Sequence, residues 1–448
     1  MTTPASKSRL SLDSNSGFAV VAAAIGLVAL LLRILYSTRA TVEAPISGDA
    51  TQYMAYAWNL LHSGTFSKVI PGSGELVVPD SYRGPGYPLL LYVALWIGET
   101  SGNWYPFVLK IQAVLGAATV FISMFLGRRF LPAPLALLSG LVLAVWPHLI
   151  TISGYLLSET LFGFLLVMSL WLSCLALERP SRKSCILAGL ASGLACLVNP
   201  IYLLFPWIVA TLLGFRKNRN LALLFLAAAM ALPVAWGVRN ASLPVRPEDP
   251  SRIMQNFVQG SWPLFQAAYM SRDVDPVPRR ILAEVSREEQ LMAKDPAAGL
   301  KSMRDRFATR PFDYLGWYVI DKVYLLWDWD IRIGQGDIYI IHTENSPFEV
   351  SPIWHAAKLA IHWLNPGFFW AALLFSIGTL VNGLRNRDSA GTTPFLLALF
   401  FFYVTGLHAV LQAEPRYSIP YRPIEILLAI GLIAVVFRSR ATQAKAPE

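Results

Sequence analysis

The stretch GFAVVAAAIGLVALLLRILY, Gly17–Tyr36, is an almost unbroken apolar run, and SGDATQYMAYAWNLLHSGTF, Ser47–Phe66, follows it closely. About 20 apolar residues are needed to cross the hydrocarbon core of a bilayer, whereas the apolar part of a signal peptide takes about 7–15. The first stretch therefore predicts a retained membrane-spanning helix. The second repeats apolar and aromatic residues behind Asp49 and predicts an amphipathic helix just outside the bilayer, headed by an acid.

The composition extends this prediction to the whole chain. The 448 residues are 55% hydrophobic and 15% charged, where a soluble domain carries about 25% charged residues. We expect an all-α polytopic membrane protein with about ten transmembrane helices. By residue number, the expected spans are 17–36, 105–127, 131–149, 154–177, 184–199, 200–214, 221–238, 354–384, 393–412 and 423–437.

The net charge of +9 requires no nucleic-acid surface, because the basic excess lies at the ends of the expected spans on one side. With the N-terminus inside, this is the pattern of the positive-inside rule. The resulting organisation is a cytoplasmic tail (1–16), a transmembrane catalytic domain (17–437) and a cytoplasmic tail (438–448), with outer loops at about 37–104 and 239–353. The basic residues on the inner side include Lys7, Arg9, Arg128, Arg129, Arg179, Arg182, Lys183, Arg216, Lys217, Arg219, Arg385, Arg387, Arg438, Arg440 and Lys445.

Both outer loops contain segments that suit the membrane interface. Leu89–Gly98 is apolar but too short to span. Phe312–Trp329 mixes aromatic residues with charges, as at the headgroup level, and its end, Trp327-Asp-Trp-Asp330, is expected to be an aromatic belt with solvated acids. The three cysteines, Cys174, Cys185 and Cys196, lie in apolar segments, so we expect small packing residues and no disulfide.

Asp49 is the first chemical candidate, and two interpretations apply to it. Asp49-Ala-Thr-Gln52 fits a capping box, in which Asp49 accepts from first-turn amides and Gln52 reaches back. A carboxylate at a helix N-terminus is also kept ionised by the helix dipole, which suits a base or a cation ligand. Tyr53 lies one turn further on the same face.

Glu159, in Ser158-Glu-Thr, is expected near the outer end of a span. An ionisable residue at membrane depth is a functional candidate by default, although a glutamate that reaches up to interfacial water would look the same. Arg33 is placed similarly in the first span, where its charged end could simply extend to the headgroups.

Three arginines mark outer membrane boundaries, where the positive-inside rule would avoid them. These are Arg83 in the Arg-Gly-Pro-Gly-Tyr-Pro turn, Arg239 before Asn240, and Arg416 in Glu-Pro-Arg-Tyr. A guanidinium can bind a lipid phosphate through two parallel hydrogen bonds. The alternative is ordinary pairing with Glu414 or Asp80.

Taken in order, these motifs resemble a known family. The pattern is similar to the polyprenyl-phosphate-dependent glycosyltransferases of the GT-C fold, and within them to the bacterial protein-O-mannosyltransferase-like group that includes the lipid A aminoarabinose transferases (glycosyltransferase families 39 and 83). The resemblance covers about residues 17–437. It is carried by Gly48-Asp49…Tyr53, Arg83-Gly-Pro-Gly-Tyr87-Pro, Ser158-Glu159, Asn199-Pro200 after Ala-Gly-Leu-Ala-Ser-Gly-Leu-Ala, Arg239-Asn240 and Glu414-Pro-Arg416-Tyr417.

The resemblance implies transfer at the outer membrane face from a polyprenyl-phosphate sugar, with Asp49 as general base, and our hypothesis is that the transfer inverts the anomeric centre. Glu159 would be the second acid, orienting Asp49 or the acceptor. A divalent metal held by Asp49 and Glu159 stays open. The implied donor-binding residues, which hold the leaving phosphate or line the site, are Tyr53, Arg83, Tyr87, Arg239, Lys322, Arg416 and Tyr417.

The chain also departs from that group. Relatives often carry Asp-Glu where Asp49 is followed by Ala50, and Arg-Pro where this chain has Asn199-Pro200. Sugar and acceptor (protein, lipid or glycan) are therefore not carried over. The resemblance further implies a bacterial inner membrane with both termini cytoplasmic. The alternatives are a lipid-linked sugar flippase, a ligase or polymerase of O-antigen type, and a non-catalytic subunit.

Overall fold

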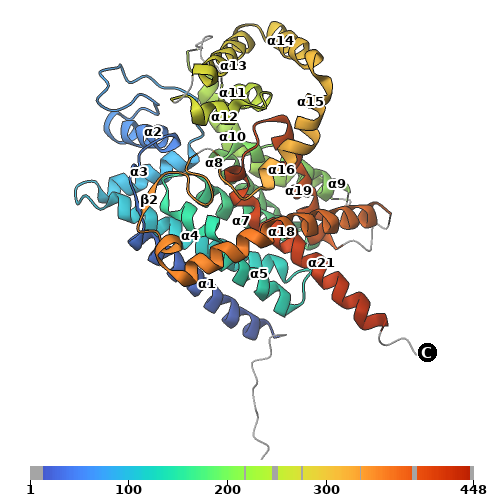
Figure 1. Cartoon of the computed structure of the whole chain (residues 1–448). Helices are drawn as coiled ribbons and strands as arrows, with labels where there is room; N and C mark the ends of the chain where they lie inside the picture. The colour runs from blue at the N-terminus through green and yellow to red at the C-terminus, as the bar shows by residue number, and fades with distance from the viewer. Residues whose placement is uncertain are drawn as a thin grey trace, which may run out of the picture.

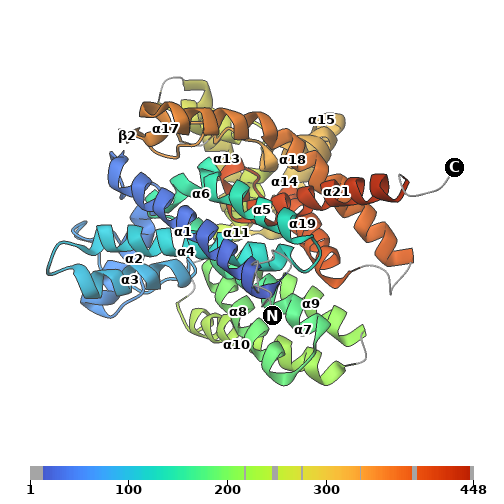
Figure 2. The same cartoon turned by 90° about the horizontal axis from the view of Figure 1, so that it is seen from below.

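The structure is a computed structural model that describes residues 14–215, 218–244, 251–273, 276–332, 334–385 and 391–443. Residues 1–13 and 444–448 of the two expected tails lie outside the described residues. Figure 1 shows a helical bundle in which the short helices α11–α14 lie at the top, while α1 begins and α21 ends at the bottom. Figure 2 looks from below and shows α7–α10 gathered on one side of the bundle.

Seven helices of the described chain are long and apolar enough to cross a bilayer, which makes this an integral membrane protein. They expose apolar side chains on their outer faces, for example Leu31 of α1 and Trp363 of α18. The seven are α1 (Asn15–Arg39), α4 (Trp104–Gly127), α7 (Glu159–Glu178), α10 (Arg219–Ala241), α18 (Pro352–Arg385), α19 (Thr392–Val410) and Pro415–Phe437, the last made of α20 (Pro415–Ser418), 3₁₀ helix η4 (Ile419–Tyr421) and most of α21 (Arg422–Gln443).

An eighth span exists if a bent pair is counted as one. Helix α5 (Ala133–Val145) and the segment Pro147–Gly154, made of α6 (Pro147–Thr151) and 3₁₀ helix η1 (Ile152–Gly154), meet at 61°. The break falls at Trp146, whose backbone is extended, because a residue before proline is pushed out of the helical region. The expected straight span 131–149 is therefore broken.

The expected spans 184–199 and 200–214 fall on shorter helices, so the count of about ten is not confirmed. Helix α8 (Arg182–Val198) has 17 residues, and 3₁₀ helix η2 (Pro200–Tyr202) leads to α9 (Phe205–Phe215) with 11. Helix α8 packs on α7 and α10. Its glycines make this approach possible, since a Cβ at Gly189 or Gly193 would lie 2.5 Å or 2.7 Å from a carbonyl oxygen of α10.

The two long loops are joined by a short pairing. Strand β1 (Thr41–Val42) of the first loop is antiparallel to β2 (Thr343–Glu344) of the second. Because the strands belong to different loops, the pairing fixes both at the same end of the bundle. The first loop also holds α2 (Asp49–Ser63) and α3 (Gly86–Gly98), and the second holds α11 (Arg252–Gly260), α12 (Phe265–Ser271), α13 (Pro276–Lys294), α14 (Pro296–Thr309), α15 (Pro311–Gly316), π-helix η3 (Trp317–Asp321), α16 (Lys322–Trp327) and α17 (Pro347–Val350).

The aromatic belt expected at the end of this loop is wrong for both of its tryptophans. Trp327 and Trp329 are each 2% exposed and belong to the main core. The indole N–H of Trp327 donates to Thr405 at 3.1 Å, and that of Trp329 donates to Asp337 at 2.5 Å. The exposed apolar side chains lie earlier, at Phe312, Leu315 and Val319. The three cysteines are buried and free.

Candidate active site

Asp49 begins α2, but it does not cap that helix. The N-cap is Gly48, with φ 56° and ψ −125°, a backbone conformation that favours glycine, and no side chain makes a cap hydrogen bond there. The expected capping box is therefore wrong. The Asp49 carboxylate points instead to two arginines, and Gln52 accepts from one of them.

Arg83 is the first of these arginines. Its Nη2 donates to Oδ1 of Asp49 at 2.5 Å and its Nε donates to Oε1 of Gln52 at 2.7 Å. The turn that carries Arg83 lies against the end of α8, because Gly84 and Gly86 have no side chain there. A Cβ would lie 2.6 Å from the carbonyl oxygen of Leu197 at the first glycine and 2.5 Å from the Val198 side chain at the second.

Arg416 connects Asp49 to Glu159. Its Nη2 donates to Oδ2 of Asp49 at 2.5 Å, and its Nε lies 3.0 Å from Oε1 of Glu159. The second contact is an ion pair without a hydrogen bond, since Nε has no hydrogen-bond partner. Arg83, Asp49, Arg416 and Glu159, here called the site cluster, thus join α2, the α2–α3 loop, α20 and the start of α7.

The four side chains of the site cluster are mostly, but not completely, buried. The side chains of Arg83, Asp49, Arg416 and Glu159 are 11%, 17%, 15% and 10% exposed, so each is reachable but poorly hydrated. Burial alone would raise the pKa of Asp49, but the cations of Arg416, Arg83 and Arg252 outweigh it and hold this pKa well below its usual range. As it stands, the carboxylate is a clamped anion and a weak base.

Arg252 was missed by the sequence reasoning. It is the first residue of α11 and is half-buried, and it acts electrostatically on Asp49 and on Tyr417. Within the described part of the chain it forms no ion pair. Its guanidinium also acts on the carboxylate of Glu289, and a cation near a clamped carboxylate is a group that an incoming anion can use. The only sequence signal was one arginine among several in a long loop.

Three tyrosines named from the sequence surround the site cluster. The guanidinium carbon of Arg83 lies over the Tyr53 ring, 5.1 Å from the centre of that ring. The Tyr53 hydroxyl is 3.3 Å from the hydroxyl of Ser158. Tyr87 meets Tyr53 edge to face and donates to Gln112 at 2.9 Å. Tyr417 lies 5.6 Å from the Arg416 guanidinium carbon. Each of the two arginines is thus held against a tyrosine ring, Arg83 by Tyr53 and Arg416 by Tyr417.

Arg239 and Lys322 are not brought into the site cluster. Arg239 donates to the backbone oxygen of Asp80 at 2.5 Å and stacks over Trp236. Lys322 is fully buried and donates to the backbone oxygen of Gly260 at 2.9 Å, and burial lowers its pKa to about 7. Both side chains therefore hold loop backbone in this structure.

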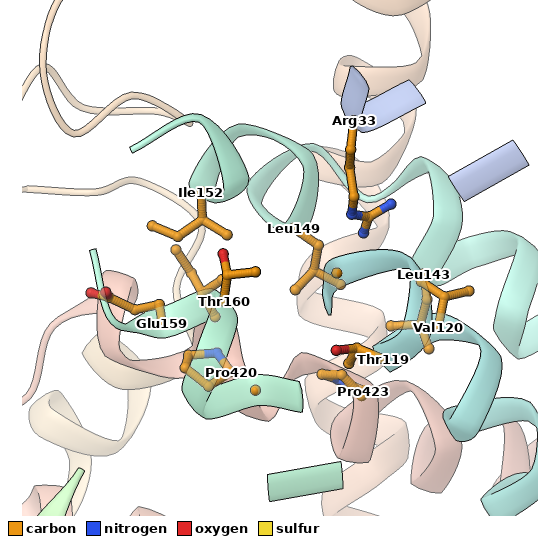
Figure 3. A pocket seen from close by; sticks show the side chains of 13 residues that line it. Arg33, Thr119, Val120, Leu143, Leu149, Ile152, Glu159, Thr160, Pro420 and Pro423 are labelled. Carbon is orange, nitrogen blue, oxygen red and sulfur yellow. The ribbon is translucent and has the colours of Figure 1, made fainter. Parts of the chain in front are cut away.

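Arg33 points inward, contrary to the simple expectation that its charge extends to the headgroups. It is 1% exposed and donates to the backbone oxygen of Ala29 at 3.0 Å. Figure 3 shows Arg33 and Glu159 on opposite sides of a cavity of about 20 Å³, which is room for about one water molecule. Glu159 therefore lies between the site cluster and a small cavity whose lining is mostly apolar, with Arg33 at its far side.

A second buried ion pair was also missed. Arg422 and Glu425 lie on the first turn of α21, are 1% and 0% exposed and meet at 2.8 Å. Arg422 also donates to Asn365 at 2.9 Å and to the backbone oxygen of Asp328 at 2.7 Å. The pair thus ties α18, the second loop and α21 together, six residues beyond Arg416.

Asp49 and Glu159 do not fit a metal ion in this arrangement. Arg416 contacts both carboxylates and takes the place that a shared cation would need. Across the described residues, no group of three His, Cys, Asp or Glu side chains could hold a metal. The site cluster is charge-balanced by arginines instead.

Comparison with known proteins shows which fold this chain shares with solved structures. No family model and no curated protein matches the chain. Among solved structures, it is similar to the archaeal oligosaccharyltransferase AglB from Archaeoglobus fulgidus in complex with an inhibitory peptide and a dolichol-phosphate, with a TM-score of 0.52 and 16% identity over 96% of this chain and 52% of that one. The apo form of that enzyme gives 0.52 and 15%, with the same coverage. ArnT from Cupriavidus metallidurans, bound to undecaprenyl phosphate, gives 0.38 and 14% over 94% and 79%.

The GT-C fold expected from the sequence is confirmed by this likeness. The present chain spans about half the length of AglB. At such low identity the agreement concerns the arrangement of helices and not the chemistry of individual residues.

Proposed function

We propose that this protein is an integral membrane glycosyltransferase that moves a sugar from a polyprenyl-phosphate donor to an acceptor at the outer membrane face. The observation that carries the proposal is the site cluster, in which Asp49 is held by Arg83 and Arg416 beside Glu159. An acid among arginines is what transfer from a phosphate-linked donor needs, because a proton must be taken up and a phosphate must be released. The shared fold with AglB, solved with a dolichol-phosphate, supports the donor class.

In the proposed reaction the acceptor hydroxyl gives its proton to Asp49 and its oxygen attacks the anomeric carbon. The bond from that carbon to the phosphate oxygen breaks, and polyprenyl phosphate leaves with the electron pair. Attack from the side opposite the phosphate inverts the anomeric centre. General-base assistance of this kind contributes about 10²–10⁴-fold to the rate.

The clamped state of Asp49 suggests how donor binding starts the reaction. Arg83 and Arg416 neutralise Asp49 and depress its pKa, which leaves it a poor base. A donor phosphate that draws these guanidiniums, together with that of Arg252, removes positive charge from the carboxylate and raises its pKa. The same arginines then stabilise the charge that develops on the leaving phosphate.

Glu159 is proposed to keep Arg416 in place while that arginine changes partners, since Arg416 contacts both acids. Tyr53, Tyr87 and Tyr417 would line the donor site, while Arg239 and Lys322 would support it through the loops. The acceptor class stays open among proteins, lipids and glycans. The location is proposed to be a bacterial inner membrane, as the resemblance implies. Both chain ends are proposed to be cytoplasmic, because the described basic residues Arg128, Arg129 and Arg182 lie at the end of the bundle opposite the site cluster.

A lipid flippase is the alternative that a specific observation could favour, namely the Arg422–Glu425 pair inside the last span. That pair is fully buried and bonded to Asn365 and backbone oxygens. Such a pair holds the packed helices in place and is not suited to move during transport, because moving it would leave several buried polar groups without partners. Transferase chemistry at the site cluster is therefore preferred.

The experiment is a donor assay on protein purified in detergent. Polyprenyl-phosphate sugars are supplied in turn, and release of free polyprenyl phosphate is followed by mass for wild type and Asp49→Asn. Glu43→Gln is the matched control, because Glu43 is an exposed acid of the same loop, and its one ion pair among the described residues is with His342. Release that is lost in Asp49→Asn and kept in Glu43→Gln supports the proposal, and equal release by all three removes Asp49 from the chemistry.

A further inference from the structure

A second pocket lies at the opposite end of the bundle. It has a volume of about 340 Å³ and is lined by Phe125, Arg128, Arg129, Trp171 and Glu178. Helix α7 begins at Glu159 in the site cluster and ends at Glu178 in this pocket. Its 20 residues rise about 30 Å, which is the thickness of a bilayer core. The pocket therefore faces the other leaflet and is too far from the site cluster to belong to the same binding site.

The charges in this pocket do not cancel. The single guanidinium group of Arg129 donates to both carboxylate oxygens of Glu178 through Nε and Nη2, and Thr393 donates to the same carboxylate at 2.9 Å. Glu178 is therefore satisfied. Arg128 has only a long contact to the backbone oxygen of Leu131 at 3.4 Å and a stacking contact with Phe18, and it forms no ion pair among the described residues. One cation is left to attract a ligand.

The shape of the pocket favours an amphipathic ligand over a small soluble anion. Its volume is in the range of ligand sites, about 300–1,000 Å³. Trp171 lies seven residues before Glu178 on α7, so one wall reaches about 10 Å toward the membrane interior. Phe125 of α4 provides a second apolar wall. An arginine at the rim and aromatic side chains below it match the phosphate and the glycerol-acyl part of a phospholipid.

We propose that this pocket binds the headgroup phosphate of an anionic phospholipid from the leaflet opposite the site cluster, with Arg128 as the main phosphate ligand. Arg129 is its neighbour and is held by Glu178, whose carboxylate also accepts from Thr393. Because Arg128 follows α4, Trp171 lies on α7 and Phe18 lies on α1, the lipid would fasten three spans together.

The test is native mass spectrometry of the full chain, purified in detergent and incubated with phosphatidylglycerol or phosphatidylcholine. Wild type should retain phosphatidylglycerol in preference to phosphatidylcholine, and Arg128→Gln should lower that retention about fivefold. Arg128→Lys, which keeps the charge, should retain most of the binding and shows that a loss in Arg128→Gln is not a folding failure. Arg182→Gln, an exposed arginine at the same end of the bundle, should change nothing.

Three results would overturn the proposal. Equal retention of the two lipids would show that the pocket does not select an anionic headgroup. An equal loss in Arg128→Gln and Arg182→Gln would show a general charge effect in place of a site. Displacement of phosphatidylglycerol by millimolar inorganic phosphate would show that a soluble anion is the ligand.

Discussion

Replacing Arg416 with lysine tests the central geometry of the site cluster. Arg416 reaches Asp49 with Nη2 at 2.5 Å and Glu159 with Nε at 3.0 Å. Lysine keeps the positive charge but has one nitrogen, so it cannot span both carboxylates. One charged contact should be lost, and a hydrogen bond to a charged group contributes about 1.5–3 kcal/mol. Each 1.36 kcal/mol is a factor of ten in rate, so kcat/KM should fall about ten- to hundredfold.

The assay is release of free polyprenyl phosphate at several donor concentrations, combined with thermal unfolding of the same samples. Arg416→Met should be worse than Arg416→Lys, because both acids then lack this cation. Arg272→Lys is the control, since Arg272 is 41% exposed and its side-chain contacts, with Asp273 at 3.7 Å and with the backbone oxygen and ring of Tyr269, stay within the second loop. Its kinetics should match those of wild type.

A double-mutant cycle separates the two contacts of Arg416. Combining Arg416→Lys with Glu159→Gln should give an interaction energy above about 0.5 kcal/mol, as residues in one network do. Additive effects would mean that Arg416 does not act through Glu159. A kcat/KM of Arg416→Lys within twofold of wild type would refute the view that the spanning geometry matters at all.

Three further predictions follow from the same structure. Because cations hold the pKa of Asp49 below its ordinary value, the carboxylate stabilises the fold above about pH 4, and that contribution is lost as pH falls. The free energy of unfolding of wild type should therefore depend on pH between about 5 and 2 more steeply than that of Asp49→Asn. Parallel profiles would contradict this. Burial lowers the pKa of Lys322 to about 7, against about 10.4 in the unfolded chain. Between these two values the lysine is protonated in the unfolded state and neutral in the folded state, so the melting temperature of wild type should rise from about pH 7 to 10. Lys322→Met should remove that rise. Gly86→Ala places a Cβ 2.5 Å from the Val198 side chain and 2.8 Å from its backbone nitrogen. The resulting strain of about 1–3 kcal/mol should shift Arg83 and lower donor turnover by a factor of about 5 to 150. Gly102→Ala would meet no atom within 4 Å but has a φ of 70°, so it should affect stability alone.

The membrane architecture could be predicted from the sequence because long apolar runs and basic loops are local signals. The short helices are the exception. Residues 184–199 and 200–214 are apolar, yet they form α8 and α9 with 17 and 11 residues. Hydropathy alone does not separate a spanning helix from a shorter buried one. The break before Pro147 was visible in the sequence, since proline constrains the residue before it.

The members of the site cluster could be named from the sequence, but their contacts could not. Asp49 and Arg416 are separated by 367 residues, and no local pattern indicates such a pairing. The capping prediction failed because Gly48 takes the cap conformation and leaves the Asp49 carboxylate for the arginines. The Arg422–Glu425 pair has helical spacing, but it was not singled out from the sequence, where Arg422 stands just before the expected span 423–437 and Glu425 stands inside it.

The most direct measurement is an experimental structure of the protein with polyprenyl phosphate bound, at a resolution that shows the phosphate and the guanidinium groups. The account predicts that the phosphate lies against Arg416, Arg83 and Arg252, and that these arginines have moved away from Asp49 and left its carboxylate facing an acceptor channel. A phosphate bound elsewhere, with Asp49 still clamped by Arg83 and Arg416, would contradict the proposed mechanism.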